Sequence, residues 1–301
     1  MWQDIRFSAR DGTQLYGRRY AASSAKRPLL CLGGIVGNSA QFDVLATALA
    51  NNGAERRSVF TIDCRGRGRS GALRAKQGSP LLTECEDVLD FMTICGLDEA
   101  AVLGTGHGGQ LAMIMAQLQP RAVGALILND SAPELEIEGV VRLLGEAASL
   151  PVPQTWVDAA GLLQRQFGRR YPKLSAEQWQ AVARSSFLDV EGRPARAFDP
   201  AIAAAYSLSR GTLARHTLWA QFAALSRVPV LFLRAELSDM VSPQTIARMR
   251  GMHPALDVVT VPREGHPALL RDAPSIAAVA TFLARNEWQE ARSETAFRAV
   301  A

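Results

Sequence analysis

Two side chains with the chemistry of an acid and a base each follow a segment that predicts a buried strand. Asp239 lies beyond the β-branched, apolar run 228–233, and His266 lies beyond the run 256–261. A carboxylate that is hydrogen-bonded to an imidazole orients the ring and stabilises its protonated form, so the ring can act as a general base. We therefore expect His266 to lie within hydrogen-bonding distance of Asp239.

A glycine-rich turn earlier in the chain supplies a third part of this arrangement. The apolar run 100–103 meets the turn 104–109 (GTGHGG), and the apolar-rich segment 110–119 follows, which predicts a strand, a sharp turn and a helix. In the G-x-S-x-G motif a serine nucleophile stands at the top of such a turn, whereas this chain has Gly106. Glycine adopts positive φ without steric cost, so the exchange should preserve the fold and change the chemistry.

The chain order of turn, acid and base resembles that of the α/β-hydrolase superfamily, and the resemblance covers nearly the whole length. It places Gly106 at the nucleophile position, Asp239 at the acid and His266 at the base. The segment 63–70 (DCRGRGRS) is also similar to the Asp-x-Arg-Gly-x-Gly-x-Ser loop that is common in this superfamily.

The same resemblance implies an oxyanion hole, a pair of backbone donors that stabilise charge on a substrate oxygen. The segment 32–35 (LGGI) is similar to the one that follows the third strand in this superfamily. The implied donors are the backbone N–H groups of Ile35 and His107. Gly34, beside the first donor, is a candidate substrate-pocket residue.

Asp130 is a second candidate for the acid, because it follows the predicted strand 125–128 and some members of the superfamily carry their acid there. The spacing from Asp239 to Pro243 resembles the usual acid loop, so Asp239 is the preferred acid. Asp130 is then expected in the substrate pocket.

The remaining pattern predicts an α/β fold of the α/β-hydrolase type, with a mostly parallel central sheet flanked by helices. A hairpin at the Asp11-Gly12 turn signal opens the chain, with strands over 5–9 and 14–20. Further strands are expected over 29–32 and 58–62, and helices over 42–49 and 81–95.

A helical cap is expected between two parts of the core. The segments 140–148, 155–167, 176–185 and 215–225 each have the periodicity of an amphipathic helix. The predicted organisation is core over 1–132, cap over 133–226 and core over 227–301. In α/β hydrolases an insertion at this place roofs the active site, so its aromatic residues are candidate pocket walls. These are Trp156, Phe167, Trp179, Tyr206 and Trp219.

Composition predicts a cytoplasmic enzyme with a small-molecule substrate. The 301 residues are 48% hydrophobic, enough for a large core, and no apolar run is long enough to cross a membrane. The net charge is +4, but the arginines are scattered, so nucleic-acid binding is not expected. The four cysteines lack metal-type spacing and are expected as reduced thiols, and no metal or cofactor is predicted.

The glycine-rich turn also satisfies the dinucleotide-binding expression G-x-G-x-x-G, with Asp130 as the ribose-binding acid. The segment 66–71 satisfies the same expression, which shows how unspecific it is. Nucleotide binding would leave Asp239, His266 and the predicted cap without a role. The hydrolase interpretation uses all of them.

Three interpretations of Gly106 remain open. In the first, the chain is an esterase, a lactonase or a related hydrolase whose serine was replaced to silence it, at a cost of about a million-fold in kcat. In the second, the histidine and its acid act on water or substrate as a general base, as in carbon–carbon bond hydrolysis or cofactor-free oxygenation. The segment 107–109 is similar to the one after the nucleophile in cofactor-free quinolone dioxygenases. In the third, the chain is a non-catalytic ligand-binding member of the fold.

Overall fold

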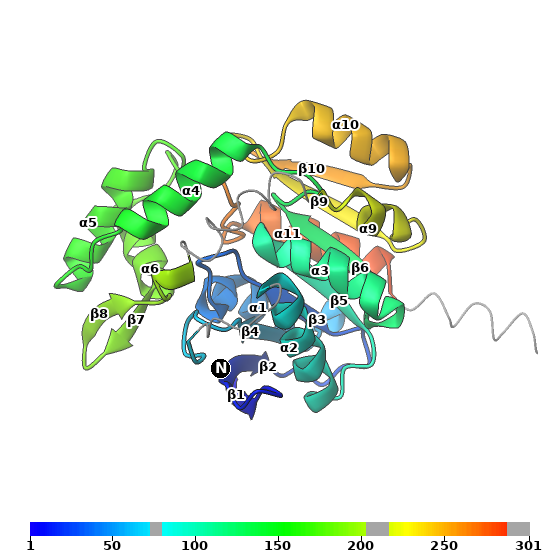
Figure 1. The fold of residues 1–301 in the computed structure, drawn as a ribbon, viewed down its shortest axis with the longest axis horizontal. Coiled ribbons are helices and arrows are strands. Elements are labelled where there is room, and N and C mark those ends of the chain that lie inside the picture. The colour runs from blue at the N-terminus through cyan, green and yellow to red at the C-terminus, as the bar shows by residue number, and fades with distance from the viewer. Residues whose placement is uncertain (73–79, 203–216, 288–301) are drawn as a thin grey trace, which may run out of the picture.

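An eight-stranded sheet forms the centre of the computed structural model, which describes residues 1–72, 80–202 and 217–287 (Figure 1). Its strands are β1 (Gln3–Ser8), β2 (Gln14–Tyr20), β3 (Leu29–Leu32), β4 (Val59–Asp63), β5 (Ala100–Thr105), β6 (Val123–Asn129), β9 (Val230–Ala235) and β10 (Asp257–Val261). They lie in the order β1-β2-β4-β3-β5-β6-β9-β10. The hairpin β1-β2 is antiparallel, and the strands from β4 to β10 pair in parallel.

Helices cover both faces of this sheet (Figure 1). Those associated with the sheet are α1 (Asp43–Ala50), α2 (Pro80–Ile94), α3 (His107–Leu118), α9 (Trp219–Ala224), α10 (Pro243–Met252) and α11 (Ala273–Arg285). Buried side chains of α2, α3, α9 and α10 share one apolar cluster, and those of α1 and α11 share another. The predicted α/β architecture with a mostly parallel, doubly covered sheet is confirmed.

The alternation of side chains along the central strands explains why the sheet has two apolar faces. Successive residues of a strand point to opposite faces, and in β5 Val102 joins the cluster around α3 while Leu103 joins the cluster around α1. In β9 Phe232 and Leu233 divide in the same way. Both faces are buried, so these strands read as continuous apolar runs in the sequence.

The segment between β6 and β9 holds a separate group of elements, which we call the insertion (residues 133–202). It contains α4 (Ile137–Ser149), α5 (Trp156–Phe167) and α6 (Ala176–Ser186), followed by the hairpin β7 (Phe187–Val190) and β8 (Arg193–Arg196). A capping box at Thr155 begins α5, and another at Ser175 begins α6. The insertion extends beyond the edge of the core in Figure 1.

Two features of this region differ from expectation. The hairpin β7-β8 was not predicted, because its strands are short and largely exposed. Its signal was the turn Glu191-Gly192, where both residues have positive φ, as a two-residue hairpin requires. The helix expected over 215–225 is the shorter α9. Its Trp219 and Phe222 pack in the apolar cluster that α9 shares with α2, α3 and α10, and not in the insertion.

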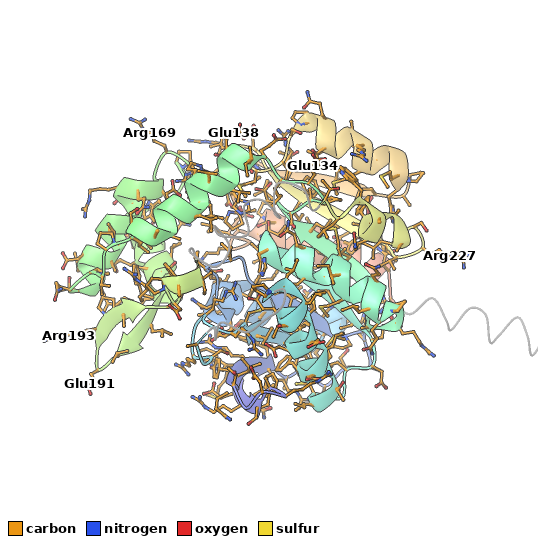
Figure 2. The ribbon with its side chains drawn as sticks, in the orientation of Figure 1. Glu134, Glu138, Arg169, Glu191, Arg193 and Arg227 are labelled. Atoms are coloured by element: carbon orange, nitrogen blue, oxygen red, sulfur yellow. The ribbon has the colours of Figure 1, made fainter. Side chains whose placement is uncertain are left out.

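Charged side chains of both signs share the surface, as at the β7-β8 tip, where Glu191 and Arg193 both point outward (Figure 2). In the described ranges no helix has the length and apolar character needed to span a bilayer. Within the same ranges no three histidine, cysteine or acidic side chains gather closely enough to hold a metal ion. The described cysteines are unpaired thiols.

Candidate functional site

Gly106 forms the apex of the sharp turn between β5 and α3. Its φ of 49° and ψ of −110° lie in a region that strains any residue with a side chain. Its N–H donates to the Asn129 carbonyl at 3.1 Å, and its carbonyl accepts from the Ser131 hydroxyl at 2.6 Å. Hydrogen bonds to the end of β6 therefore fix the turn from both sides.

The other glycines of this turn allow close packing between α3 and the sheet. A Cβ atom on Gly108 would stand 2.3 Å from the Leu32 carbonyl oxygen, and one on Gly104 would stand 2.4 Å from the Gly109 nitrogen. A Cβ atom on Gly109 would stand 2.4 Å from the Ser131 hydroxyl oxygen. Close packing at Gly104 and Gly109, and positive φ at Gly106, therefore account for the G-x-G-x-x-G spacing without a phosphate. The nucleotide-binding interpretation also needs Asp130 to bind a ribose. The Asp130 carboxylate is instead bonded to the His266 ring.

The imidazole of His266 lies between Asp130 and Gly106. Its Nδ1 is 2.7 Å from Oδ2 of Asp130, which is fully buried at the end of β6. Its Nε2 is 3.2 Å from the place where a Cβ on Gly106 would stand. When the carboxylate accepts the Nδ1 proton, Nε2 is left as a proton acceptor that faces the turn. This geometry makes His266 a positioned base.

The predicted hydrogen bond between Asp239 and His266 is wrong. Both carboxylate oxygens of Asp239 instead accept from the Arg142 guanidinium of α4, each at 2.6 Å. These bonds lower the pKa of Asp239. Arg142 thus competes for Asp239, and the sheet order also favours Asp130. Asp130 follows β6, which lies directly beside β5 and its turn, whereas Asp239 follows β9, one strand farther away.

The loop that carries His266 is fastened on two sides. Asn129 Nδ2 donates to the Ala268 carbonyl at 2.9 Å, and the Tyr171 hydroxyl of the insertion donates to the Pro267 carbonyl at 2.8 Å. Tyr171 is buried, and burial raises the pKa of its hydroxyl, which keeps it a donor. The core and the insertion therefore hold the imidazole in place together.

Buried charged side chains support the segment that carries the first expected oxyanion donor, Ile35. The turn at Gly34 is closed by the Gly37 N–H, which donates to the Gly34 carbonyl at 2.9 Å. The next carbonyl, that of Ile35, accepts from Nε of Arg67 at 2.9 Å. Arg67 is 1% exposed and bonds Glu84 as well. The Gly37 bond thus holds the peptide that contains the Ile35 N–H, and Arg67 of the motif loop 63–70 holds the peptide that follows it.

Glu84 connects this arginine to the second expected donor. Its Oε2 lies 2.7 Å from Nε2 of His107, so the His107 ring is directed at the buried Glu84 carboxylate. Burial alone would raise the pKa of Glu84, but Arg67 and His107 outweigh it and lower the pKa to about 2. Sequence reasoning missed Glu84, although Arg67 in the motif loop was a signal for a buried acid.

Two cavities meet at His266. One, of about 340 Å³, is lined by Ile35, Gly106, His107 and residues of α4. The other, of about 190 Å³, extends under the insertion and is lined by Phe167 and Trp179, two of the expected aromatic walls. The expected donors and His266 therefore border one space.

The other expected pocket residues lie elsewhere. Trp156 donates to the Gly192 carbonyl and stacks on Arg184, while Trp219 lies in the core and donates to Glu134. Asp130 lies behind His266. Gly34 supports the turn beside the donor segment, and Tyr206 falls outside the described residues.

Comparisons with known proteins identify the family. A family model described as the alpha/beta hydrolase fold matches residues 27–273. The chain is 30% identical over 269 residues to the 3-hydroxybutyrate-oligomer hydrolase of Cupriavidus necator, covering 85% of this chain and 88% of that one. It is 27% identical over 240 residues to the 2-(acetamidomethylene)succinate hydrolase of Mesorhizobium japonicum, covering 79% and 81%.

A solved structure agrees with these sequence relatives. An alpha/beta hydrolase from Novosphingobium aromaticivorans superimposes with a TM-score of 0.85 at 33% identity, covering 94% of this chain and 98% of that one. The parallel sheet, the elbow between β5 and α3, and the named relatives lead to one assignment. The chain is a member of the α/β-hydrolase fold family, an enzyme family whose relatives here are hydrolases.

Proposed function

We propose that the chain hydrolyses small esters, lactones or related carbonyl compounds, with His266 and Asp130 acting as a general-base pair on water. One observation carries this proposal: Nδ1 of His266 is bonded to buried Asp130, while Nε2 faces Gly106 and the cavity. Gly106 is taken as the nucleophile position of the family. With no hydroxyl there, the base acts directly on a water molecule from the cavity.

The reaction follows from where protons and charge would move. His266 Nε2 removes a proton from water as the water oxygen attacks the substrate carbonyl carbon. The backbone N–H groups of Ile35 and His107 stabilise the oxyanion that forms. As the carbonyl is restored, the bond to the leaving oxygen breaks and the imidazolium returns the proton to it. Asp130 stabilises the imidazolium throughout.

The insertion would act as the cap of this enzyme. Its Tyr171 fastens the loop of His266, and α4 contributes to the cavity next to Gly106. Excluding bulk water strengthens the electrostatic interactions inside the site. We propose a cap over 133–226 between two parts of the core, and we retain a cytoplasmic location as a prediction.

The first test removes the base. His266→Ala should abolish hydrolysis of 4-nitrophenyl acetate and 4-nitrophenyl butyrate, because no other described side chain combines the Asp130 bond with a face toward Gly106. His253→Ala is the matched control, since the His253 Nε2 bonds only to backbone carbonyls. Full turnover in a folded His266→Ala protein would disprove the mechanism.

The companion variant restores a nucleophile. Gly106→Ser should raise the kcat of ester hydrolysis by several orders of magnitude. The upper limit is roughly a million-fold, the loss in kcat when a serine is removed from an intact triad. The imidazole would have to shift slightly, because the new Cβ would lie 3.2 Å from it. An unchanged rate in folded protein would favour one of the other interpretations of Gly106. These are an enzyme that cleaves carbon–carbon bonds or adds oxygen, and a ligand-binding protein without catalysis.

A further inference from the structure

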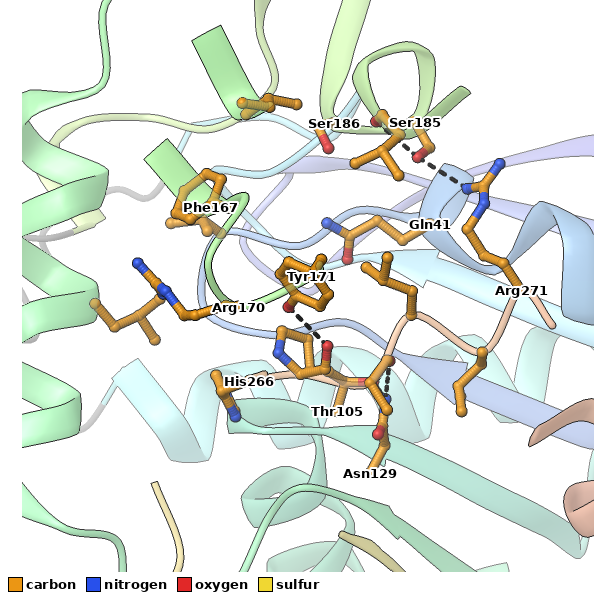
Figure 3. A pocket seen from close by; sticks show the side chains of 18 of the residues that line it. Gln41, Thr105, Asn129, Phe167, Arg170, Tyr171, Ser185, Ser186, His266 and Arg271 are labelled. Atoms are coloured by element: carbon orange, nitrogen blue, oxygen red, sulfur yellow. Dashed lines mark hydrogen bonds between the residues drawn. The ribbon is translucent and has the colours of Figure 1, made fainter. Parts of the chain in front are cut away.

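The smaller cavity beside His266 has an end that the proposed reaction does not use (Figure 3). Polar side chains from three elements meet there: Arg271 from the loop before α11, Ser185 and Ser186 from the end of α6, and Gln41 from the short helix η1 (Ser39–Phe42). Most of the lining between this end and His266 is apolar, including Phe42, Leu163, Phe167, Trp179, Leu269 and Leu270.

Arg271 is a half-buried cation for which the described residues provide no ion-pair partner. Its Nη1 donates to the Ser185 hydroxyl at 3.3 Å, and among the described residues it forms no ion pair. Nearby acids are already engaged. Asp43 bonds Arg18 and Tyr20, and Asp272 caps α11 by accepting from the Ser275 N–H at 2.8 Å.

The environment of this guanidinium favours an anion. Burial lowers the pKa of Arg271, an effect that Asp43 only partly opposes, so the charged form lacks the solvation it would have in water. The fully buried arginines of the described chain have acidic partners, as Arg67 has Glu84 and Arg65 has Asp87. A planar fork of donors is best matched by the two oxygens of a carboxylate.

We propose that Arg271, assisted by Ser185, Ser186 and Gln41, binds a carboxylate of the substrate. The substrates would then be esters that carry a carboxylate a few carbons from the reacting carbonyl, with the short apolar spacer lying against the aromatic wall. This assignment rests on the proposed function for the carbonyl end at His266. It adds the substrate class, since neutral esters of the same length would leave the cation unpaired.

Binding of matched ligands tests this assignment. Calorimetry on the full chain would compare the monoethyl esters of succinic, glutaric and adipic acids with neutral ethyl esters of the same chain length. The best half-ester should bind at least about tenfold more tightly than its neutral counterpart. Arg271→Gln should remove this preference. Arg271→Lys should retain part of it, because an ammonium keeps the charge but loses the fork.

Arg285→Gln provides the matched control, since it removes the same charge from an exposed arginine that pairs with Asp257. It should leave the preference unchanged. Equal affinities for charged and neutral esters in the unaltered protein, or a preference that survives Arg271→Gln, would overturn the assignment. If Arg271→Gln does not fold, an unchanged preference in Arg271→Lys would overturn it instead. A carboxylate preference without any ester hydrolysis would reject the proposed function and leave this binding site standing.

Discussion

Asp130 and Asp239 both follow strands of the same parallel sheet, yet their surroundings give them opposite roles. Asp130 is fully buried, and its partner is the imidazole of His266. The Asp239 side chain is 50% exposed, and the Arg142 guanidinium takes both of its oxygens. The first carboxylate orients an imidazole, and the second joins the core to the insertion.

The difference shows that position after a strand does not by itself make a carboxylate an orienting acid. An arginine fork bonded to both oxygens leaves none directed at an imidazole. Among the described residues, Oδ1 of Asp130 has no hydrogen-bond partner, so the His266 ring is the group that its charge can stabilise. Within the described ranges Asp130 has no arginine or lysine partner, whereas Asp239 is paired with Arg142, and this distinguishes the two sites.

The largest effect that separates the two carboxylates should appear in catalysis. In the Gly106→Ser protein, Asp130→Asn should reduce kcat for 4-nitrophenyl butyrate by about 10⁴-fold, because an amide favours the wrong histidine tautomer. Asp239→Asn in the same protein should change kcat less than about threefold, since a surface ion pair contributes little. Steady-state kinetics on both variants checks this.

If Asp239→Asn were instead the more damaging change, Asp239 would again be assigned as the acid, as the sequence analysis predicted. Equal losses in both variants would mean that the Arg142–Asp239 contact with the insertion and the His266–Asp130 pair depend on each other. Thermal unfolding of each variant separates loss of fold from loss of chemistry.

Glu84 extends the comparison to a third carboxylate. It is as buried as Asp130 but is paired with the Arg67 guanidinium. Glu84→Gln would leave Arg67 without its buried counter-charge, and removing one member of such a pair typically costs about 3–5 kcal/mol in the free energy of unfolding. Denaturant unfolding measures this loss. Asp90→Asn, which weakens the exposed pair with Arg10, is the control and should cost less than about 1 kcal/mol.

The pH dependence of stability provides a second test of the role of Glu84. The pKa of Glu84 falls from its ordinary value of 4.5 to about 2 in the folded chain. A lowered folded-state pKa means that the stabilisation is complete above pH 4.5 and is lost as pH falls toward 2. The Glu84→Gln protein should therefore lose less stability across this window than the unaltered chain. Identical acid unfolding would show that Glu84 does not carry the effect.

Much of the core followed from the sequence because strand periodicity and turn chemistry are local. The strand over 29–32 and the hairpin at Asp11-Gly12 form where expected. The choice of acid could not be made locally, since it depends on β6 lying beside β5 and on Arg142 reaching Asp239 from α4. Contacts between distant segments determine such partners.

The smallest expected effect concerns the ion pair that holds Asp239. Arg142→Gln should lower the free energy of unfolding by less than about 1 kcal/mol, because both side chains are partly solvent-exposed. The loss should shrink in high salt, which screens exposed charges. The Arg142 bonds lower the pKa of Asp239, so its contribution is present above pH 3.8 and disappears as pH falls below that value. A double-mutant cycle with Asp239→Asn measures the coupling. A coupling energy of several kcal/mol would show that the Arg142–Asp239 pair stabilises the fold as a buried pair does. The contrast between the Asp239 and Asp130 sites would then fail.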